Sequence, residues 1–425
     1  RCGCGHRRAR DRWRRGGREL TMRRIVARIA VLTFALAFGG CSVWNDFFGN
    51  EEEASIKLEP KALKRIDAEV ELEKLWDRNL GKDTDGREAR LVPALVGSRV
   101  FAVSVDGNAY ALDAADGREI WRVNVGEQTG GRWFRFRSVN HVVSGGVGAG
   151  ADLIFVGLTD GSVVALSQND GSLSWQVQMT SEVLAPPQVG GDKVIVQTID
   201  GSIAALDVLD GEQQWSYTTS VPALTLRGTT TPLVRSGFVV SGFANGRIAV
   251  LDLQNGIPRL DTKIAAAKGK SDLERLVDVD GQLVVDGSTL IAASYQGNIA
   301  AYDLQEGVPR WIKELSSTAG LASGFGNVYA VEDNGHVKAF DTQNANEVWS
   351  SDALEYREVS TPFTSGSFVL MGDFEGYLHV LAQSDGRFVG RRRVDRKGIQ
   401  ATAAVDGSRL YIIGNSGRLN AFEIR

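Results

Sequence analysis

The sequence predicts an all-β protein, an eight-bladed β-propeller with four antiparallel strands in each blade. Three observations support this prediction: a turn glycine that recurs eight times, a tryptophan at a fixed distance from most of those glycines, and one tryptophan ahead of the first repeat. The repeats are 38 to 54 residues long, and a period of about 40–45 residues built from short strands is typical of propeller blades. The recurring turn glycines are Gly107, Gly161, Gly201, Gly246, Gly297, Gly335, Gly376 and Gly417.

The repeat that runs from Asp200 to Trp215 shows the unit most clearly. It contains two Asp-Gly pairs, at positions 200–201 and 210–211, with a short apolar run between them. An Asp-Gly pair between apolar runs indicates a hairpin with a tight primed turn, because glycine adopts a positive φ at little cost. We therefore expect one strand before the second pair and another after it, the latter with Trp215.

The outer strand of each blade is marked by the position 14 residues after the turn glycine. Six repeats have a large apolar residue there: Trp121, Trp175, Trp215, Leu260, Trp311 and Trp349. In the seventh repeat the place is taken by Gly390, and the eighth begins at Gly417, close to the last residue, Arg425. Trp76 precedes the first repeat and has no turn glycine of its own. We expect the strand around Trp76 to complete the eighth blade, so that pairing of the two chain ends closes the ring.

Small residues are expected where neighbouring blades meet. The pattern Ala-x-Asp-x-x-x-Gly-x-x-x-Trp is complete in three repeats, which begin at Ala111, Ala205 and Ala301. A small residue lets adjacent blades approach closely, and the tryptophan of the outer strand can pack across the junction. This spacing resembles the tryptophan-docking repeat of quinoprotein dehydrogenase propellers, which bears on architecture and not on function.

The N-terminal region has the features of an export signal. After Met22 come basic residues, an apolar run at 29–38 and then small residues, which is typical of a secretory signal and too short to span a membrane. The stretch Phe38-Gly39-Gly40-Cys41 resembles a bacterial lipobox, which predicts lipidation of Cys41. The residue after the cysteine, Ser42, favours the outer membrane, with the protein on its periplasmic face. An ordinary signal peptide with an unrelated cysteine is the alternative.

These features divide the chain into four parts. We interpret residues 1–21 as an upstream start assigned in error and residues 22–40 as a lipoprotein signal peptide. Residues 41–70 are polar and are expected to form a tether between lipid and propeller. Residues 71–425 are predicted to form the propeller.

Charge and reactive side chains exclude several functions. Residues 41–425 carry a net charge of −13, since the whole chain is −4 and residues 1–40 are +9, and an acidic body argues against nucleic acid as a partner. The three cysteines, at positions 2, 4 and 41, precede the propeller, so neither a disulfide framework nor a cysteine metal site is expected there. His141, His336 and His379 fall in different repeats and are interpreted as ordinary strand or loop residues. We predict no catalytic residue, no metal site and no cofactor.

An enzyme is one alternative class. The glycine run at 146–150 resembles a dinucleotide fingerprint, but it continues into an apolar strand, whereas a phosphate site needs a helix N-terminus. A quinone-dependent dehydrogenase would fit the repeat. Proteins of that class commonly carry an adjacent cysteine pair over the cofactor, and this sequence has none.

Three segments exceed the basic repeat, at 126–151, 221–232 and 264–280, and propellers place recognition surfaces in such loops. Within them, Ser220-Val-Pro-Ala-Leu-Thr-Leu-Arg-Gly228 and Leu273-Glu-Arg-Leu-Val-Asp-Val-Asp280 resemble motifs of the BamB family. Glu375-Gly-Tyr-Leu and Asp385-Gly-Arg-Phe-Val389 resemble a third. The family consists of propeller lipoproteins of the outer-membrane β-barrel assembly machinery, the BAM complex.

The resemblance implies a non-catalytic scaffold that binds the periplasmic domains of BamA, the central subunit of that machinery. It also implies a role in the insertion of outer-membrane proteins. The unfolded chains of these proteins are a further candidate partner. The family's contact positions correspond to Leu224, Leu226, Arg227, Asp278 and Asp280. A generic periplasmic interaction hub is the alternative binding function.

A physical interpretation of these residues agrees with that role. Leu224 and Leu226 alternate across one residue, so both can project in one direction as an apolar anchor. Arg227 can donate two hydrogen bonds to a carboxylate or to backbone carbonyls. Asp278 and Asp280 can receive a basic partner side chain or orient Arg227. The alternatives are that the leucines cap the blade core and that the aspartates form a solvated turn.

Overall fold

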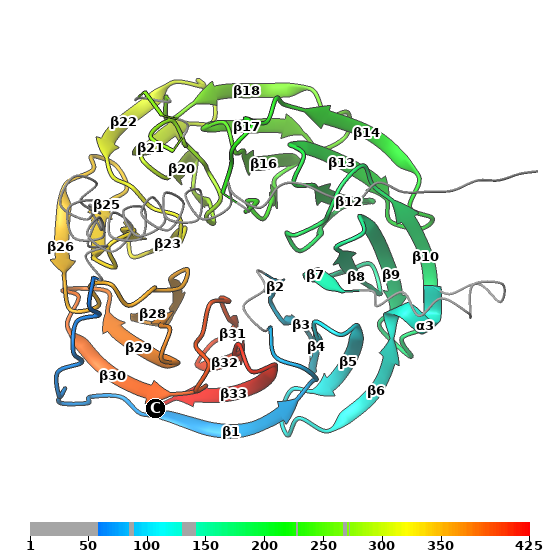
Figure 1. Ribbon diagram of the computed structural model, residues 1–425, viewed down its shortest axis with the longest axis horizontal. Coiled ribbons are helices and arrows are strands. Elements are labelled where there is room, and N and C mark those ends of the chain that lie inside the picture. Colours follow the sequence, from blue (N-terminus) through cyan, green and yellow to red (C-terminus); the bar gives the residue numbers. More distant parts are fainter. Residues whose placement is uncertain (1–57, 85–88, 130–141, 227, 267–269, 272) are drawn as a thin grey trace, which may run out of the picture. The chain divides into compact units, whose positions relative to one another are not determined.

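The strands follow one another around a ring of blades (Figure 1). The computed structural model describes residues 58–84, 89–129, 142–226, 228–266, 270–271 and 273–425, and residues from Pro60 to Arg425 belong to one compact unit. In this described part of the chain the strands form eight sheets. The predicted eight-bladed propeller is therefore confirmed.

Each blade is a short antiparallel meander whose first strand lies nearest the ring centre. Blade 1 contains β3 (Ala94–Val96), β4 (Arg99–Val103), β5 (Asn108–Asp113) and β6 (Glu119–Asn124). Blade 2 contains β7 (Val143–Gly150), β8 (Leu153–Leu158), β9 (Ser162–Ser167) and β10 (Leu173–Gln178). Blade 3 contains β11 (Gln188–Gly190), β12 (Lys193–Gln197), β13 (Ser202–Asp207) and β14 (Gln213–Thr218). Blade 4 contains β15 (Leu233–Arg235), β16 (Phe238–Gly242), β17 (Arg247–Asp252) and β18 (Pro258–Lys263).

The second half of the ring repeats the pattern. Blade 5 contains β19 (Val284–Asp286), β20 (Thr289–Ala293), β21 (Asn298–Asp303) and β22 (Pro309–Glu314). Blade 6 contains β23 (Leu321–Gly324), β24 (Asn327–Val331), β25 (Val337–Asp341) and β26 (Glu347–Ser351). Blade 7 contains β27 (Phe363–Ser365), β28 (Phe368–Gly372), β29 (Tyr377–Ala382) and β30 (Phe388–Arg393). Blade 8 contains β31 (Ala404–Asp406), β32 (Arg409–Ile413), β33 (Arg418–Ile424) and, from the other end of the chain, β1 (Leu72–Asn79).

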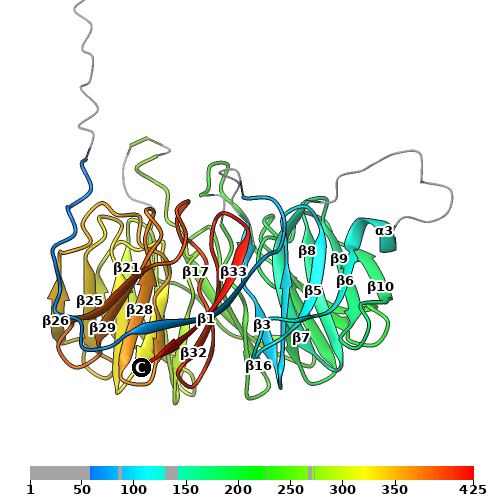
Figure 2. The same cartoon turned by 90° about the horizontal axis from the view of Figure 1, so that it is seen from below.

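Closure of the ring depends on pairing between β1 and β33. The two strands are antiparallel, with Trp76 opposite Ala421 and Leu72 opposite Ile424. Two backbone hydrogen bonds between Glu71 and Arg425, of 2.8 and 2.9 Å, extend the pairing to the last residue. Figure 2 shows the blue β1 beside the red β33. The predicted closure around Trp76 is confirmed, and it leaves no open sheet edge between the first and last blades.

Tryptophans hold neighbouring blades together, as the repeat predicted. In the described part of the chain, six indole N–H groups each donate to a backbone carbonyl of the next blade at 2.9 to 3.0 Å. The donors are Trp76, Trp121, Trp175, Trp215, Trp311 and Trp349. Most of these rings also lie against the second turn glycine of the next blade. A Cβ on Gly117, for example, would come within 2.6 Å of Trp76. A side chain at that glycine would push the blades apart.

The hairpin turns form where they were expected, but their type differs. At the first repeat Gly107 has a φ of 88° and its N–H donates to the carbonyl of Ser104. The preceding Asp106 is not among the described residues that have a positive φ. The turn is therefore an ordinary turn followed by a left-handed glycine, and the primed turn was a wrong expectation. In the fifth repeat Gln296, with a φ of 46°, adopts the left-handed conformation in place of Gly297.

Blade 2 departs from the common pattern. A short strand, β2 (Arg90–Leu91), pairs in parallel with β7 and gives this blade a fifth strand on its inner side. The glycine run at 146–150 lies within β7, and a Cβ on Gly148 would lie 1.9 Å from the carbonyl oxygen of Pro187. These glycines therefore permit close packing against the connection to blade 3. The loop 126–151 that precedes and includes β7 begins with helix α3 (Val125–Thr129), and its residues 130–141 lie outside the described part.

The lipobox with Cys41 and the residues assigned to the signal peptide also lie outside the described residues. In the part of the chain that is described, no helix is long and apolar enough to cross a membrane.

Candidate partner-binding site

Two of the long loops meet in the structure. Residues 219–232 connect blade 3 to blade 4, and residues 264–283 connect blade 4 to blade 5, so both loops leave the sheets at the same end. The hydroxyl of Thr230 donates to the carbonyl of Val279 at 2.5 Å. A Cβ on Gly228 would lie 2.3 Å from the Asp280 carboxylate, so a larger residue there would force the Asp280 side chain to move. The structure thus brings together the two motifs that carry the predicted site residues.

The first loop presents an apolar side chain to solvent. Leu224 is 43% exposed and Leu226 is half-buried. Such exposure contradicts the alternative that Leu224 caps the blade core, and it agrees with an apolar anchor. Arg227, the third predicted residue of this loop, lies outside the described residues. Next to it in sequence, the N–H of Gly228 donates to the carbonyl of Leu226 at 2.9 Å.

The two aspartates of the second loop are buried. Asp278 is 1% exposed and Asp280 is 5% exposed, so the solvated-turn alternative is wrong. Neither carboxylate oxygen of Asp278 has a hydrogen-bond partner of normal geometry among the described residues. Burial, together with the neighbouring Asp280 carboxyl, raises the pKa of Asp278 well above its usual value. The two carboxyl groups therefore pack inside the loop and are not exposed to a basic side chain of a partner.

The Asp278 carboxyl should make stability depend on pH. The pKa of this carboxyl is 3.8 in the unfolded chain and is raised in the folded protein. The folded state is therefore most favoured below pH 3.8, and it loses stability as the pH rises above that value. The variant Asp278→Asn should therefore gain stability relative to the parent protein, by at most about 1.4 kcal/mol per pH unit above about pH 4. Urea unfolding from pH 4 to 7 measures the difference. The exposed Asp210→Asn serves as the control, and equal pH slopes for the parent protein and Asp278→Asn would contradict the assignment.

Arg90 is a residue of this site that the sequence did not reveal. It lies in β2, on the inner side of blade 2 (Figure 1), and its Nη1 donates to the carbonyl of Asp280 at 3.0 Å and to that of Thr229. One guanidinium thus binds the backbone of both loops. Arg90 is separated from Asp280 by 190 positions and falls outside the strand repeat, so no local pattern pointed to it.

The site combines an exposed apolar side chain with a buried polar interior. Its distinctive features are an exposed leucine, a buried aspartate pair and an arginine that holds backbone carbonyls. Within the described ranges, no group of three His, Cys, Asp or Glu side chains is placed to hold a metal ion. Fold and site together define a β-propeller whose inter-blade loops form a surface typical of protein recognition.

Comparison with known proteins identifies the family. The model of the family described as outer membrane protein assembly factor BamB matches residues 68–134, 105–351 and 325–425. The BamB of Pseudomonas aeruginosa is 39% identical over 93% of this chain and 98% of that protein. The BamB of Escherichia coli K12 is 36% identical over 89% of this chain and 94% of that protein. The chain belongs to the BamB family.

Solved structures agree with this assignment. The crystal structure of BamB from Moraxella catarrhalis matches with a TM-score of 0.73 and 28% identity, covering 83% of this chain and 100% of that one. A quinohemoprotein alcohol dehydrogenase from Pseudomonas putida HK5 matches with a TM-score of 0.63 at 14% identity, covering 84% of this chain and 76% of that one. The second likeness shows the shared propeller fold alone.

Proposed function

We propose that this protein is a non-catalytic scaffold lipoprotein of the outer-membrane β-barrel assembly machinery. It is anchored through Cys41 at the periplasmic face of the outer membrane, binds the periplasmic domains of BamA and assists insertion of outer-membrane proteins. The observation that carries the proposal is the family match over nearly the whole chain, whose relatives are named outer membrane protein assembly factors.

The geometry of the two loops supports the proposed contact. Leu224 supplies exposed apolar area, which forms the centre of many protein interfaces. The buried Asp278 and Asp280, with Arg90 on the loop backbone, keep the loop in a defined shape. A preformed loop binds more tightly than a flexible one, because less conformational entropy is lost on association. Arg227 belongs to the same loop in sequence and is proposed to supply a charged hydrogen bond to BamA.

The test is recovery of BamA by the double variant Leu226→Ala/Arg227→Ala. We expect its affinity for BamA to fall at least about tenfold, since truncation of central interface residues commonly costs more than 1 kcal/mol. Leu209→Ala is the matched control. Leu209 is 78% exposed and lies in the turn before β14, at the end of that strand opposite to the 219–232 loop. Binding of the control should equal that of the parent protein.

Two further measurements make the result decisive. Urea unfolding of the double variant shows whether the half-buried Leu226 is needed for stability, because a folded variant is required for the comparison. A folded double variant that recovers BamA as well as Leu209→Ala would defeat the site assignment. Titration with a quinone cofactor and calcium tests the dehydrogenase alternative, and no binding is expected.

A further inference from the structure

The segment of residues 60–70, here called the strap, lies against the outside of blades 6 and 7. It was expected to be the end of the tether, yet it forms backbone hydrogen bonds at both ends. The N–H of Lys61 donates to the carbonyl of Glu355 at 2.9 Å, and the N–H of Val70 donates to the carbonyl of Val389 at 3.1 Å. Between them, Leu63 packs against the apolar cluster of blades 6 and 7. Both ribbon views show this blue segment beside β26 (Figures 1 and 2).

The sequence of blade 7 leaves room for the strap. The other outer strands carry a tryptophan or leucine at the docking position, whereas β30 has Gly390. A Cβ on Gly390 would lie 2.9 Å from Val70 Cγ2 and 3.1 Å from the Val70 carbonyl oxygen. The glycine that interrupts the tryptophan pattern is therefore the place where the strap crosses the blade.

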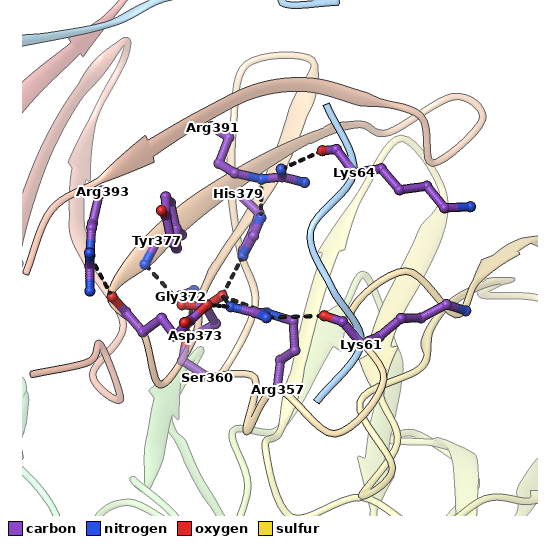
Figure 3. Close-up of polar contacts among 11 residues, drawn as sticks. Lys61, Lys64, Arg357, Ser360, Gly372, Asp373, Tyr377, His379, Arg391 and Arg393 are labelled. Atoms are coloured by element: carbon purple, nitrogen blue, oxygen red, sulfur yellow. Dashed lines mark hydrogen bonds and ion pairs between the residues drawn. The ribbon is translucent and has the colours of Figure 1, made fainter. Parts of the chain in front are cut away.

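Two arginines hold the strap by its backbone (Figure 3). Arg357 Nη1 donates to the carbonyl of Lys61 at 3.1 Å, and Arg391 Nη1 donates to the carbonyl of Lys64 at 2.8 Å. Both hydrogen bonds are accepted by main-chain carbonyls of the strap and not by its side chains. Arg357 is 3% exposed, so its charge needs compensation within the protein.

A buried histidine and aspartate connect the two arginines. Arg391 Nε donates to His379 Nδ1 at 3.1 Å. Because a guanidinium N–H can only donate, His379 Nδ1 must be unprotonated. The proton of the ring therefore sits on Nε2, which donates to Asp373 Oδ2 at 3.0 Å. The same carboxylate accepts a hydrogen bond from Arg357 Nε at 2.9 Å. His379 and Asp373 are fully buried.

The charges around His379 balance only while the ring is neutral. The groups that face it are Arg391 from β30, Arg357 from the loop after β26, and Asp373 after β28, with Tyr377 and Phe388 packed beside the ring. Glu375 is the second carboxylate on Arg357. Two arginines and two carboxylates cancel. A proton on Nδ1 would add a buried positive charge and remove the acceptor of the Arg391 hydrogen bond.

We propose that Arg357, Asp373, His379 and Arg391 form a proton-sensitive clamp that holds the strap on blade 7 and fixes where the N-terminal chain leaves the propeller. With the clamp closed, attachment of the chain to the propeller begins at Lys61 and not at Glu71. The eleven strap residues would otherwise add about 36–40 Å of extended reach. This role is independent of BamA binding and can be measured without a partner.

The direction of the pH effect follows from the histidine. Burial lowers the pKa of His379 below 6.5, and the nearby Arg391 and Arg357 lower it further, although the hydrogen bond to Asp373 opposes this. In the proposed open state His379 is exposed to solvent, so it takes up a proton at a pH where the ring in the closed clamp stays neutral. The closed state is therefore fully favoured above about pH 6.5 and loses stability as the pH falls below that value. Strap opening should rise by at most about tenfold per pH unit.

Hydrogen exchange of the full chain, measured by mass spectrometry, tests the clamp. Protection factors of peptides covering residues 60–70 should be constant above about pH 6.5 and fall by up to about tenfold per unit below it. His379→Gln, which cannot take up the proton, should remove this pH dependence. Arg391→Ala should lower strap protection at every pH, because the bond to the Lys64 carbonyl is lost.

Arg393→Ala is the matched control. Arg393 lies two residues along the same strand, and its Nε donates to the Glu375 carbonyl without touching the strap (Figure 3). Its strap protection should match that of the parent protein. Peptides of the fully buried β20 in the same samples report global unfolding and identify any variant that fails to fold. Strap protection that is independent of pH in the parent protein, or equal in Arg391→Ala and Arg393→Ala, would overturn the proposal.

Discussion

Replacing Trp76 with alanine is expected to lower the free energy of unfolding by about 3–5 kcal/mol, the usual range for removing a buried tryptophan. Trp76 is 8% exposed, and its indole N–H donates to the Ala114 carbonyl at 3.0 Å. Its ring lies against Gly117 and is 5.9 Å from the ring of Tyr411. The side chain therefore joins the closing blade to blade 1. Chemical denaturation followed by circular dichroism measures the loss.

Trp311→Ala separates closure from ordinary tryptophan packing. Trp311 donates the same type of hydrogen bond, to Thr342 at 2.9 Å, but it is half-buried and joins two blades that are consecutive in the chain. We expect a smaller loss of stability for this variant. Trp76→Ala should also expose β1 to hydrogen exchange, because the strand is held mainly by β33 and by this docking contact. A loss below about 1 kcal/mol for Trp76→Ala would show that the contact does not hold the ring closed.

The architecture could be predicted because its determinants are local and repeated. A left-handed glycine such as Gly107 specifies a turn, and the residue 14 positions later specifies which strand lies outermost. These signals recur in nearly every blade, so an exception in one repeat does not hide the pattern. Closure could be predicted from Trp76, the one tryptophan without a turn glycine ahead of it, because the eighth blade of a closed ring needs an outer strand.

The environment of the site residues could not be predicted, because it depends on contacts between distant segments. Asp278 looks like a solvated loop residue in sequence, yet the loop folds inward and leaves it 1% exposed. Arg90 reaches this loop from 190 positions away. His379 looked like an ordinary strand residue for the same reason. Its partner Arg391 lies 12 positions along the chain, but Arg391 also binds Lys64, which is 327 positions away. Repeat patterns carry no information about such pairs.

Replacing Asp373 with alanine is expected to be as damaging as the loss of Trp76, again about 3–5 kcal/mol, because it removes the buried counter-charge of the buried Arg357 guanidinium. Burial alone would raise the pKa of the Asp373 carboxyl, but hydrogen bonds from His379, the Tyr377 N–H and Arg357 hold its pKa below 3.8. The carboxylate is therefore charged at neutral pH. Without it, Arg357 at 3% exposure would keep only Glu375, and His379 would lose its acceptor.

Glu375→Gln is the control for charge alone. Glu375 binds the same guanidinium, but its side chain is 43% exposed, and water compensates its loss. We expect less than about 1 kcal/mol for this variant. Urea unfolding of both variants at pH 7 measures the contrast, and hydrogen exchange of residues 60–70 should show the strap released in Asp373→Ala. Equal stability losses in the two variants would mean that the buried carboxylate contributes no more than a surface ion pair. The clamp would then have no anionic centre on which Arg357 and His379 depend.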